Sequence, residues 1–291
     1  MKEAFFYKNL KEKIIQCQLC AHFCTLKDGE TGKCRVRKNL GGKLYALTYG
    51  KPVSISIDSI TKKPLYHFME NTFTFSIGMA GCNMSCLFCQ NWGISQKSPD
   101  AFKVKEVSPK ELISMALKSG CPTISYTYTE PFISYEYVFD CAKIAKKAGL
   151  KNILVTNGYV NETPFEELAN YIDAMNIDLK SFNDKTYLKY CGARLKPVLD
   201  TIKRAHKKGI HIEITTLIIP GINDNIPELK KIAKFIYNID KKGNIPWHIS
   251  RFFPRYKFDD GKHEITPLKK LEEAQKIGEK AGLKYVYLGN I

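Results

Sequence analysis

Three cysteines lie close together in residues 81–92, at Cys82, Cys86 and Cys89. Their spacing, Cys-x3-Cys-x2-Cys, puts three thiolates on one loop, whereas a cubic iron–sulfur cluster normally takes four Cys ligands. The missing fourth ligand would leave one iron open to bind a small molecule, as catalytic metal sites keep an open position. A zinc ion is the alternative, and it needs a fourth ligand from elsewhere in the chain. The candidates for that ligand are His67, Cys121, Cys141 and Cys191.

A second group of cysteines lies near the N-terminus, with the spacing Cys-x2-Cys-x3-Cys-x9-Cys. It consists of Cys17, Cys20, Cys24 and Cys34. Four thiolates are enough for a closed structural zinc site or for a second iron–sulfur cluster. We expect structural zinc first, because the loop at residues 26–33 resembles a zinc knuckle. A redox cluster and reduced thiols without metal are the alternatives.

Composition places the chain among ordinary folded proteins. It has 291 residues, 44% hydrophobic and 25% charged, which excludes disordered, collagen-like and coiled-coil classes. No apolar run approaches the ~20 residues of a membrane span, and residues 1–8 lack the apolar stretch of a signal peptide. We therefore expect a cytoplasmic protein without membrane contact, where clustered cysteines indicate metal or redox chemistry. The net charge of +16 suits an anionic partner or a Lys-rich solvated surface, and the absence of a long basic run favours the second.

Alternating strand and helix patterns predict the scaffold that holds the cysteines. Strand-like segments occur at residues 73–77, 123–128, 152–155, 175–179, 212–217, 247–252 and 285–288, with helical patterns between them. This alternation predicts an α/β fold with a parallel sheet and right-handed crossovers. Six strand–helix units and a final strand are fewer than a closed barrel needs, so we expect a partial (β/α)6 parallel barrel over residues 71–291.

Residues 1–70 are predicted to form a small Cys-rich N-terminal extension. Two alternating runs there, residues 43–49 and 52–58, are expected to pair as a short antiparallel hairpin around a turn at Gly50 and Lys51. In the barrel, Ser108 and Thr163 each precede Pro and then Glu, and this pattern predicts a helix start. Basic residues followed by glycine predict helix ends. These glycines are Gly149, Gly209 and Gly282.

Several barrel strands alternate apolar and polar residues, although parallel strands buried on both faces usually read as continuous apolar runs. In residues 174–180, for example, Asn176, Asp178 and Lys180 share one face. The apolar face must meet the helices, so the polar face should line the lumen. Buried charges are unfavourable unless they pair or bind a ligand. We therefore expect a lumen that binds something polar, with a self-satisfied salt-bridge network as the alternative.

The loop motif Cys-x3-Cys-x-aromatic-Cys, in which Phe88 is the aromatic residue, resembles that of the radical S-adenosylmethionine (SAM) superfamily. The resemblance extends from about residue 72 to the C-terminus. Within that superfamily the chain is similar to pyruvate formate-lyase activating enzymes and, more closely, to the AmmeMemoRadiSam system radical SAM enzyme. The supporting segments are the N-terminal cysteines and residues 126–131, 156–159, 178–180 and 219–221.

The resemblance implies a 4Fe-4S cluster on Cys82, Cys86 and Cys89, whose open iron chelates SAM through its amine and carboxylate. Reductive cleavage would give methionine and a 5′-deoxyadenosyl radical that abstracts hydrogen from a substrate. An external electron donor of flavodoxin or ferredoxin type is implied, with a protein or small-molecule substrate. The family name also implies a functional association with Memo-type proteins. Radical modification of an anionic small molecule or nucleic acid is an alternative, and a zinc-bearing nucleic-acid-binding protein or an electron carrier would be non-enzymatic.

The resemblance also implies cofactor-binding residues at the strand ends. Glu130 would accept the cofactor's ammonium and Thr129 would add a hydrogen bond, while Phe88 would pack near the adenine. Asn157 is expected to reach the ribose or carboxylate, or else to be a turn residue. Asp178 and Lys180 would bind ribose and carboxylate, or pair with each other.

Further along the chain, Glu213 is expected on the lumen face, and Pro220 in a turn that brings backbone close to the adenine. His248 would touch cofactor or substrate, or be a hydrogen-bonded core histidine. Cys191, before Gly192, is predicted to pack at a helix end, with a hydrogen-donor role in the lumen as the alternative.

Overall fold

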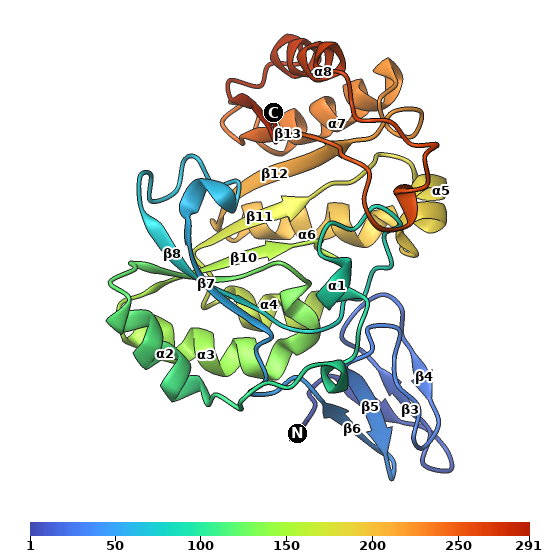
Figure 1. The fold of residues 1–291 in the computed structure, drawn as a ribbon, viewed down its shortest axis with the longest axis vertical. Coiled ribbons are helices and arrows are strands. Elements are labelled where there is room, and N and C mark those ends of the chain that lie inside the picture. The colour runs from blue at the N-terminus through green and yellow to red at the C-terminus, as the bar shows by residue number, and fades with distance from the viewer.

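An eight-stranded sheet forms the centre of the molecule, and a computed structural model describes all residues, 1–291. Its strands follow the order β14-β13-β12-β11-β10-β9-β8-β7, so neighbours along the chain are neighbours in the sheet (Figure 1). All pairs from β8 to β14 are parallel, and only β7 is antiparallel. The strands are β7 (Ser54–Ser59), β8 (Phe73–Gly78), β9 (Thr123–Tyr126), β10 (Lys151–Thr156), β11 (Ala174–Asp178), β12 (His211–Ile218), β13 (Trp247–Arg251) and β14 (Val286–Gly289). The predicted α/β partial barrel is confirmed, with seven parallel strands at the predicted places.

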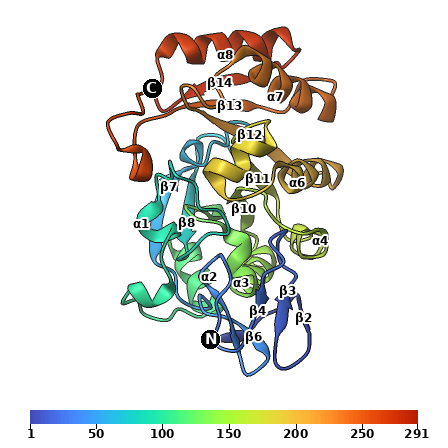
Figure 2. The same cartoon turned by 90° about the vertical axis from the view of Figure 1, so that its right-hand side faces the viewer.

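Helices connect these strands and cover the outer face of the sheet (Figure 2). The longer ones are α2 (Pro109–Lys118), α3 (Tyr135–Lys147), α4 (Glu162–Ala169), α6 (Leu195–Lys207), α7 (Ile226–Ile239) and α8 (Leu268–Lys280), and α1 (Trp92–Ser95) and α5 (Asp184–Thr186) are short. Ser108 caps α2 with Glu111 in a capping box, as predicted. The predicted start at Thr163 is wrong: α4 begins after Asn161, whose N–H and side-chain amide bond to Leu19 and Gln18 of the N-terminal segment.

The N-terminal residues form two small antiparallel sheets. One contains β1 (Lys2–Glu3), β6 (Lys43–Ala46) and β5 (Arg37–Leu40), and the other contains β2 (Tyr7–Asn9), β3 (Ile15–Cys17) and β4 (Thr25–Leu26). The predicted pairing of residues 43–49 with 52–58 is wrong, because β6 pairs with β5 and β1, and β7 pairs with β8. The hairpin turn is instead at Gly41 and Gly42, whose φ angles of 65° and 90° suit a tight turn. The edge strand β7 thus lies within the predicted extension but belongs to the barrel sheet.

The connection between β7 and β8 crosses the inner face of the sheet. The backbone N–H groups of Tyr66 and His67 donate to the carboxylate of Glu213 on β12, at 3.0 and 2.8 Å. The Asn176 side chain on β11 donates to the carbonyl of Pro64 at 2.8 Å. Polar residues on the inner strand faces therefore hold this connection, which closes one end of the lumen.

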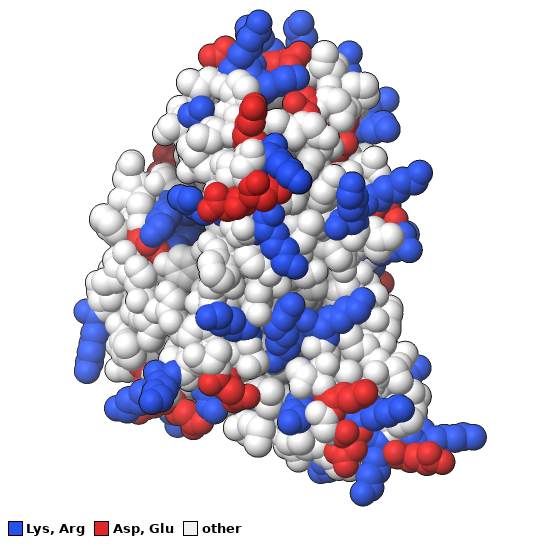
Figure 3. Space-filling model, turned by 45° about the vertical axis from the view of Figure 1, so that its right-hand side comes forward, with Lys and Arg blue, Asp and Glu red and all other residues white.

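A large apolar core lies between the sheet and the helices. Arg37 and Glu136, both fully buried, join the N-terminal sheets to α3 through a two-pronged ion pair. Figure 3 shows Lys and Arg spread over one face with Asp and Glu among them. None of the helices has the length and apolar character needed to cross a bilayer.

Candidate active site at the carboxyl ends of the strands

A cavity of about 720 Å³ opens at the carboxyl ends of the parallel strands, where α/β barrels carry their chemistry. Most of the residues that line it are polar, and the three loop cysteines also lie on its wall. The predicted site residues that line it are Cys82, Cys86, Phe88, Cys89, Thr129, Glu130, Asn157, Asp178, Lys180 and His248. Residues far apart in the sequence are therefore brought to one space large enough for a nucleotide-sized ligand.

The cysteine loop leaves β8 through Gly81, whose φ of 86° is in the left-handed region. A π-helical turn, Tyr187–Cys191, fixes its position. The N–H of Ser85 donates to the carbonyl of Cys191 at 2.9 Å, and the N–H of Leu87 donates to that of Tyr190 at 3.0 Å. The loop is thus held to the π-helical turn by backbone hydrogen bonds.

The three thiols form a donor set suited to a cluster. Burial and the charge of Glu130 raise the pKa of Cys82 well above its ordinary value, so that thiolate needs a cationic partner such as iron. The N–H of Met84 donates to the sulfur of Cys82 at 3.4 Å, and Ser95 Oγ lies 3.2 Å from the sulfur of Cys89. No group of three His, Cys, Asp or Glu side chains is arranged tightly enough to hold one metal ion. The wider arrangement around a cavity fits a cluster of several irons better than a zinc ion.

Glu130 follows β9 and is buried at the cavity wall. Its carboxylate accepts hydrogen bonds from the hydroxyl of Thr156 at 2.8 and 2.9 Å and from the N–H of Asn157 at 2.8 Å. Burial outweighs these bonds and raises the pKa of Glu130 to about 7. Thr129 directs its hydroxyl to the carbonyl of Met79 at 2.8 Å. A cation entering the cavity would meet a carboxylate that ionises readily in its presence.

The turn before Glu130 is strained. Tyr128 has a φ of 67°, which is rare for a bulky residue, and its hydroxyl bonds to Asp58. Its ring leaves no space for a side chain at Gly78, where a Cβ would lie 2.8 Å from the ring. Lys63 lies over the same ring at 4.4 Å. This clamp on Tyr128 orients the backbone that carries Thr129 and Glu130.

Two charged residues at the end of β11 face the cysteines. Asp178 and Lys180 form an ion pair at 2.8 Å, as the alternative interpretation of these residues expected, and both also line the cavity. Although burial lowers it, the charges of Asp178 and the Cys86 and Cys191 thiols raise the pKa of Lys180 well above its ordinary value. Phe88 is buried, with its ring 5.8 Å from that of Phe258.

Glu213 and Pro220 are the two predicted cofactor residues that do not line the cavity. Glu213 is fully buried and accepts hydrogen bonds from His211 at 2.9 Å and from His248 at 2.6 Å, besides the two backbone donors of the β7–β8 connection. Its lone pairs are thus occupied within the protein. The self-satisfied network therefore exists around Glu213, while the rest of the polar lumen stays open.

Several residues that line the cavity were not predicted from the sequence. The most notable are Lys62, Lys63 and Tyr66 from the β7–β8 connection. Asp58 pairs with both lysines at 2.6 Å, so one carboxylate faces two ammonium groups. The sequence gives no signal for them, because nothing in residues 60–66 indicates that this segment turns into the barrel. Cys191 is buried at the end of the π-helical turn with its thiol hydrogen-bonded to Cys86, which agrees with a packing role.

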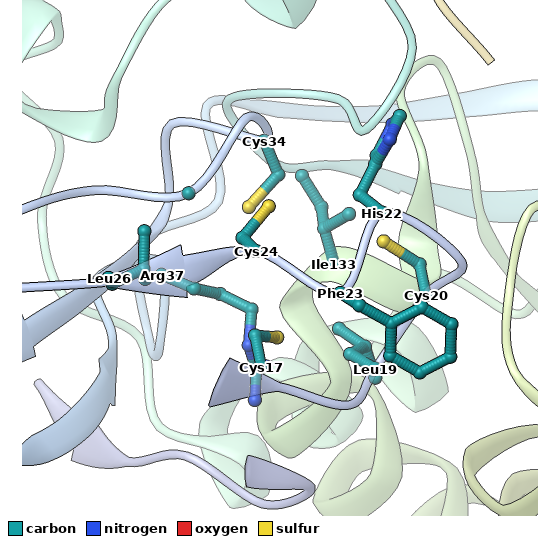
Figure 4. A pocket seen from close by; sticks show the side chains of 11 residues that line it. Cys17, Leu19, Cys20, His22, Phe23, Cys24, Leu26, Cys34, Arg37 and Ile133 are labelled. Carbon is teal, nitrogen blue, oxygen red and sulfur yellow. The ribbon is translucent and has the colours of Figure 1, made fainter. Parts of the chain in front are cut away.

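The N-terminal cysteines line a different space. Cys17, Cys20, Cys24 and Cys34 surround a small pocket of about 10 Å³ between the N-terminal sheets and the barrel (Figure 4). Arg37 and apolar side chains complete its wall. The spacing of these four cysteines in the sequence correctly predicted that they lie together.

Comparison with known proteins agrees with this geometry. The family model of the radical SAM superfamily matches residues 76–236. An uncharacterised protein of Methanocaldococcus jannaschii is 46% identical over the whole of this chain and 86% of its own length. The pyruvate formate-lyase-activating enzyme of Clostridium pasteurianum is 26% identical over 58% of this chain and 72% of its own. A protein of M. jannaschii that is named as a glycyl-radical enzyme activating enzyme is 30% identical over 59% of this chain and 64% of its own length.

Solved structures show the same fold. A radical SAM methyltransferase from Sphaerobacter thermophilus superposes with a TM-score of 0.57 at 14% identity, over 76% of this chain and 67% of that one. The hydrogenase maturase HydG from Carboxydothermus hydrogenoformans gives a TM-score of 0.53 at 16% identity, over 71% of this chain and 50% of its own. Together with the matched family model and the activase-like relatives, these findings identify an oxidoreductase-type enzyme, and the chain belongs to the radical SAM superfamily.

Proposed function

We propose that this protein cleaves SAM reductively at a 4Fe-4S cluster bound by Cys82, Cys86 and Cys89. Such cleavage is general behaviour of the superfamily to which the chain belongs. The observation that carries the proposal is the placement of three thiols, one buried and two half-buried, on the wall of a 720 Å³ cavity that is also lined by Glu130, Asp178 and Lys180. When bound, the cluster supplies one electron to the sulfonium of SAM.

The chain's own residues hold and orient the nucleotide. Glu130 binds the ammonium of the methionine part, because it is a buried carboxylate on the cavity wall whose charge acts on Cys82. Lys180 pairs with a carboxylate, and Asp178 accepts hydrogen bonds from ribose hydroxyls. Phe88 contributes apolar surface near the adenine, while Thr129, Asn157 and His248 complete the polar wall. Burial of Phe88, Glu130, Asn157 and His248 helps to exclude water from the radical reaction.

The similarity to activating enzymes supports a protein substrate and an external reductant of flavodoxin or ferredoxin type. One observation supports a second candidate, radical modification of an anionic molecule. Lys62 and Lys63 at the cavity share the single carboxylate of Asp58, which leaves a net positive charge beside the space where a substrate would enter. A small anionic group, on a polypeptide or on a free molecule, would be attracted there.

Anaerobic turnover tests the proposal. The iron-reconstituted protein is incubated with SAM and dithionite, and 5′-deoxyadenosine and methionine are quantified. We expect equal amounts of both products from the native chain and none from Cys86→Ala. Cys121→Ala, which changes a buried cysteine outside both groups, is the matched control and should retain turnover. If the native protein retains its iron but releases no 5′-deoxyadenosine, the proposal is refuted.

A further inference from the structure

The N-terminal thiol pocket has the features of a metal-binding site that is separate from the SAM cavity. Four cysteine sulfurs come together there, from the last residue of β3 and from the loops before β4 and β5, enclosed by Leu19, Leu26 and Ile133 (Figure 4). Cys17 and Cys34 are buried, and Cys20 and Cys24 are half-buried. Four thiols around one enclosed apolar space are a complete ligand set for a metal centre.

No three of these thiols are arranged to hold a single metal ion. In a tetrahedral zinc site the Zn–S distances are about 2.3 Å, so the four sulfurs touch and leave no void between them. Here the pocket retains about 10 Å³, which is room for one water, and no compact set of three ligands is present. A group of several metal ions bridged by sulfide holds its four thiolates further apart, and it fits this arrangement better than zinc does.

Arg37 provides a second, independent indication of an occupant, one that accepts a hydrogen bond. It is fully buried and lines the thiol pocket. One terminal nitrogen binds Glu136 at 3.0 Å and the other donates to the carbonyl of Phe5 at 2.6 Å, but the Nε–H has no acceptor. A buried donor without an acceptor is unfavourable. A thiolate or sulfide of an iron–sulfur cluster would supply the acceptor that the Nε–H lacks.

The pocket lies directly against the cysteine loop of the SAM site. A Cβ at Gly81 would be 2.5 Å from the carbonyl oxygen of Cys34, so these backbones are in contact. His22 Nε2 lies 2.7 Å from the carbonyl oxygen of Asn83. Cys82 therefore stands between two residues that touch the N-terminal loops. On the other side, the half-buried Cys20 and the 43% exposed Phe23 bring the pocket close to the surface.

We propose that Cys17, Cys20, Cys24 and Cys34 bind a second iron–sulfur cluster, which relays electrons from an external one-electron carrier to the SAM-cleaving cluster. In the relay step the second cluster is oxidised by one electron as the first is reduced by one, with no proton or group transferred. A low-potential carrier of flavodoxin or ferredoxin type then reduces the second cluster again. Binding of the second cluster is independent of the proposed SAM chemistry, whereas the relay rests on it.

Metal analysis of the full chain tests the binding. After anaerobic reconstitution we expect about eight irons per native chain and about four in the triple variant Cys82→Ala, Cys86→Ala, Cys89→Ala. That variant should also retain the electron paramagnetic resonance (EPR) signal of a reduced cluster that SAM does not alter. Cys121→Ala is the control and should match the native chain. A triple variant that holds zinc, or neither metal, would overturn the second cluster.

Electron delivery tests the relay. The double variant Cys20→Ser, Cys24→Ser should keep about four irons and the native affinity for SAM, yet cleave SAM at least about tenfold more slowly when reduced flavodoxin is the donor. An undiminished rate would overturn the relay. Loss of SAM affinity in that variant would also count against it, because the effect would then be structural. If the native chain fails to cleave SAM while the triple variant keeps its four irons, the second cluster stands and the proposed function fails.

Discussion

The side-chain amide of Asn157 donates to the sulfur of Cys82 at 3.6 Å. The same nitrogen donates to the side-chain oxygen of Asn83 at 2.9 Å, and the backbone N–H of Asn157 donates to Glu130. One residue at the end of β10 therefore joins the cysteine loop after β8 to the buried carboxylate after β9. Asn157 thus acts on the candidate site by positioning the loop and the carboxylate relative to each other.

Replacing Asn157 by Ala should loosen this junction. The change removes a donor from Asn83, which is itself buried, and an unsatisfied buried acceptor costs about 1–3 kcal/mol. We expect a loss of that size in urea-induced unfolding of the metal-free protein, together with slower SAM cleavage. Asn170→Ala, at an exposed helix end, should change neither quantity. Unchanged stability and turnover in the Asn157 variant would show that the junction is unimportant.

Affinity for SAM should depend on pH through Glu130. Burial raises the pKa of this carboxyl to about 7, and only the ionised form attracts an ammonium group. Below about pH 7, protonation therefore competes with binding, and the dissociation constant should rise by up to about tenfold per pH unit. Equilibrium dialysis between about pH 6 and pH 8 measures this change.

The variant Glu130→Gln separates this effect from others. It should bind SAM about tenfold or more weakly at high pH, since a hydrogen bond to a charged group contributes about 1.5–3 kcal/mol, and the pH dependence should flatten. Glu272→Gln, on the exposed side of α8, is the control. A Gln variant that keeps the native pH profile would assign the titration to another group.

Because the two cysteine loops are in contact, we expect position 81 to accept no side chain. An Ala there meets the carbonyl of Cys34 and a methyl of Val36, each at 2.5 Å, besides adopting a φ of 86°. Gly120 has a φ of 72° with nothing within 4 Å of a Cβ, so Gly120→Ala measures the backbone strain alone, about 1–2 kcal/mol. We expect Gly81→Ala to lose clearly more than this in thermal unfolding, and to bind less iron. Equal losses in both variants would mean that the loops can separate freely.

Stability in acid should depend on Glu213. Although burial raises it, hydrogen bonds from His211, His248 and two backbone N–H groups lower the pKa of Glu213 to about 2, from 4.5. Because the folded pKa is depressed, the unfolded chain binds more protons between these values, and the free energy of unfolding falls as pH decreases through that window. The stabilisation present above about pH 4.5 amounts to about 3 kcal/mol.

Urea unfolding of the native chain and Glu213→Gln at about pH 6 and pH 3 measures this stabilisation. The variant should be less stable at the higher pH, and the difference between the two chains should shrink at the lower pH. Glu272→Gln should follow the native chain throughout. A constant difference across the two conditions would contradict the assignment.

The sequence located most of the scaffold and the centre of the site, and its failures have physical causes. The alternation of strand-like and helical segments marked the seven parallel strands, and spacing alone grouped both sets of cysteines. The pairing of strands could not be predicted in this way. Residues 43–49 and 52–58 both have a strand pattern, but nothing in the local sequence indicates that β7 pairs with β8.

Long-range contacts of the β7–β8 connection could not be predicted from the sequence either. Glu213 was expected to face the ligand, but the connection after β7 supplies its donors, and no pattern in residues 60–67 reveals that path. Lys62 and Lys63 were missed for the same reason. Positions set by secondary-structure period were therefore predictable, whereas contacts made by an irregular segment depended on the folded chain.

Electron–nuclear double resonance with SAM carrying ¹⁵N at its amine tests the central claim most directly. The reduced, cluster-containing protein should show a hyperfine coupling between the labelled nitrogen and the cluster spin, and Cys86→Ala should abolish it. Bound SAM without any such coupling would contradict the assignment of an open iron at Cys82, Cys86 and Cys89.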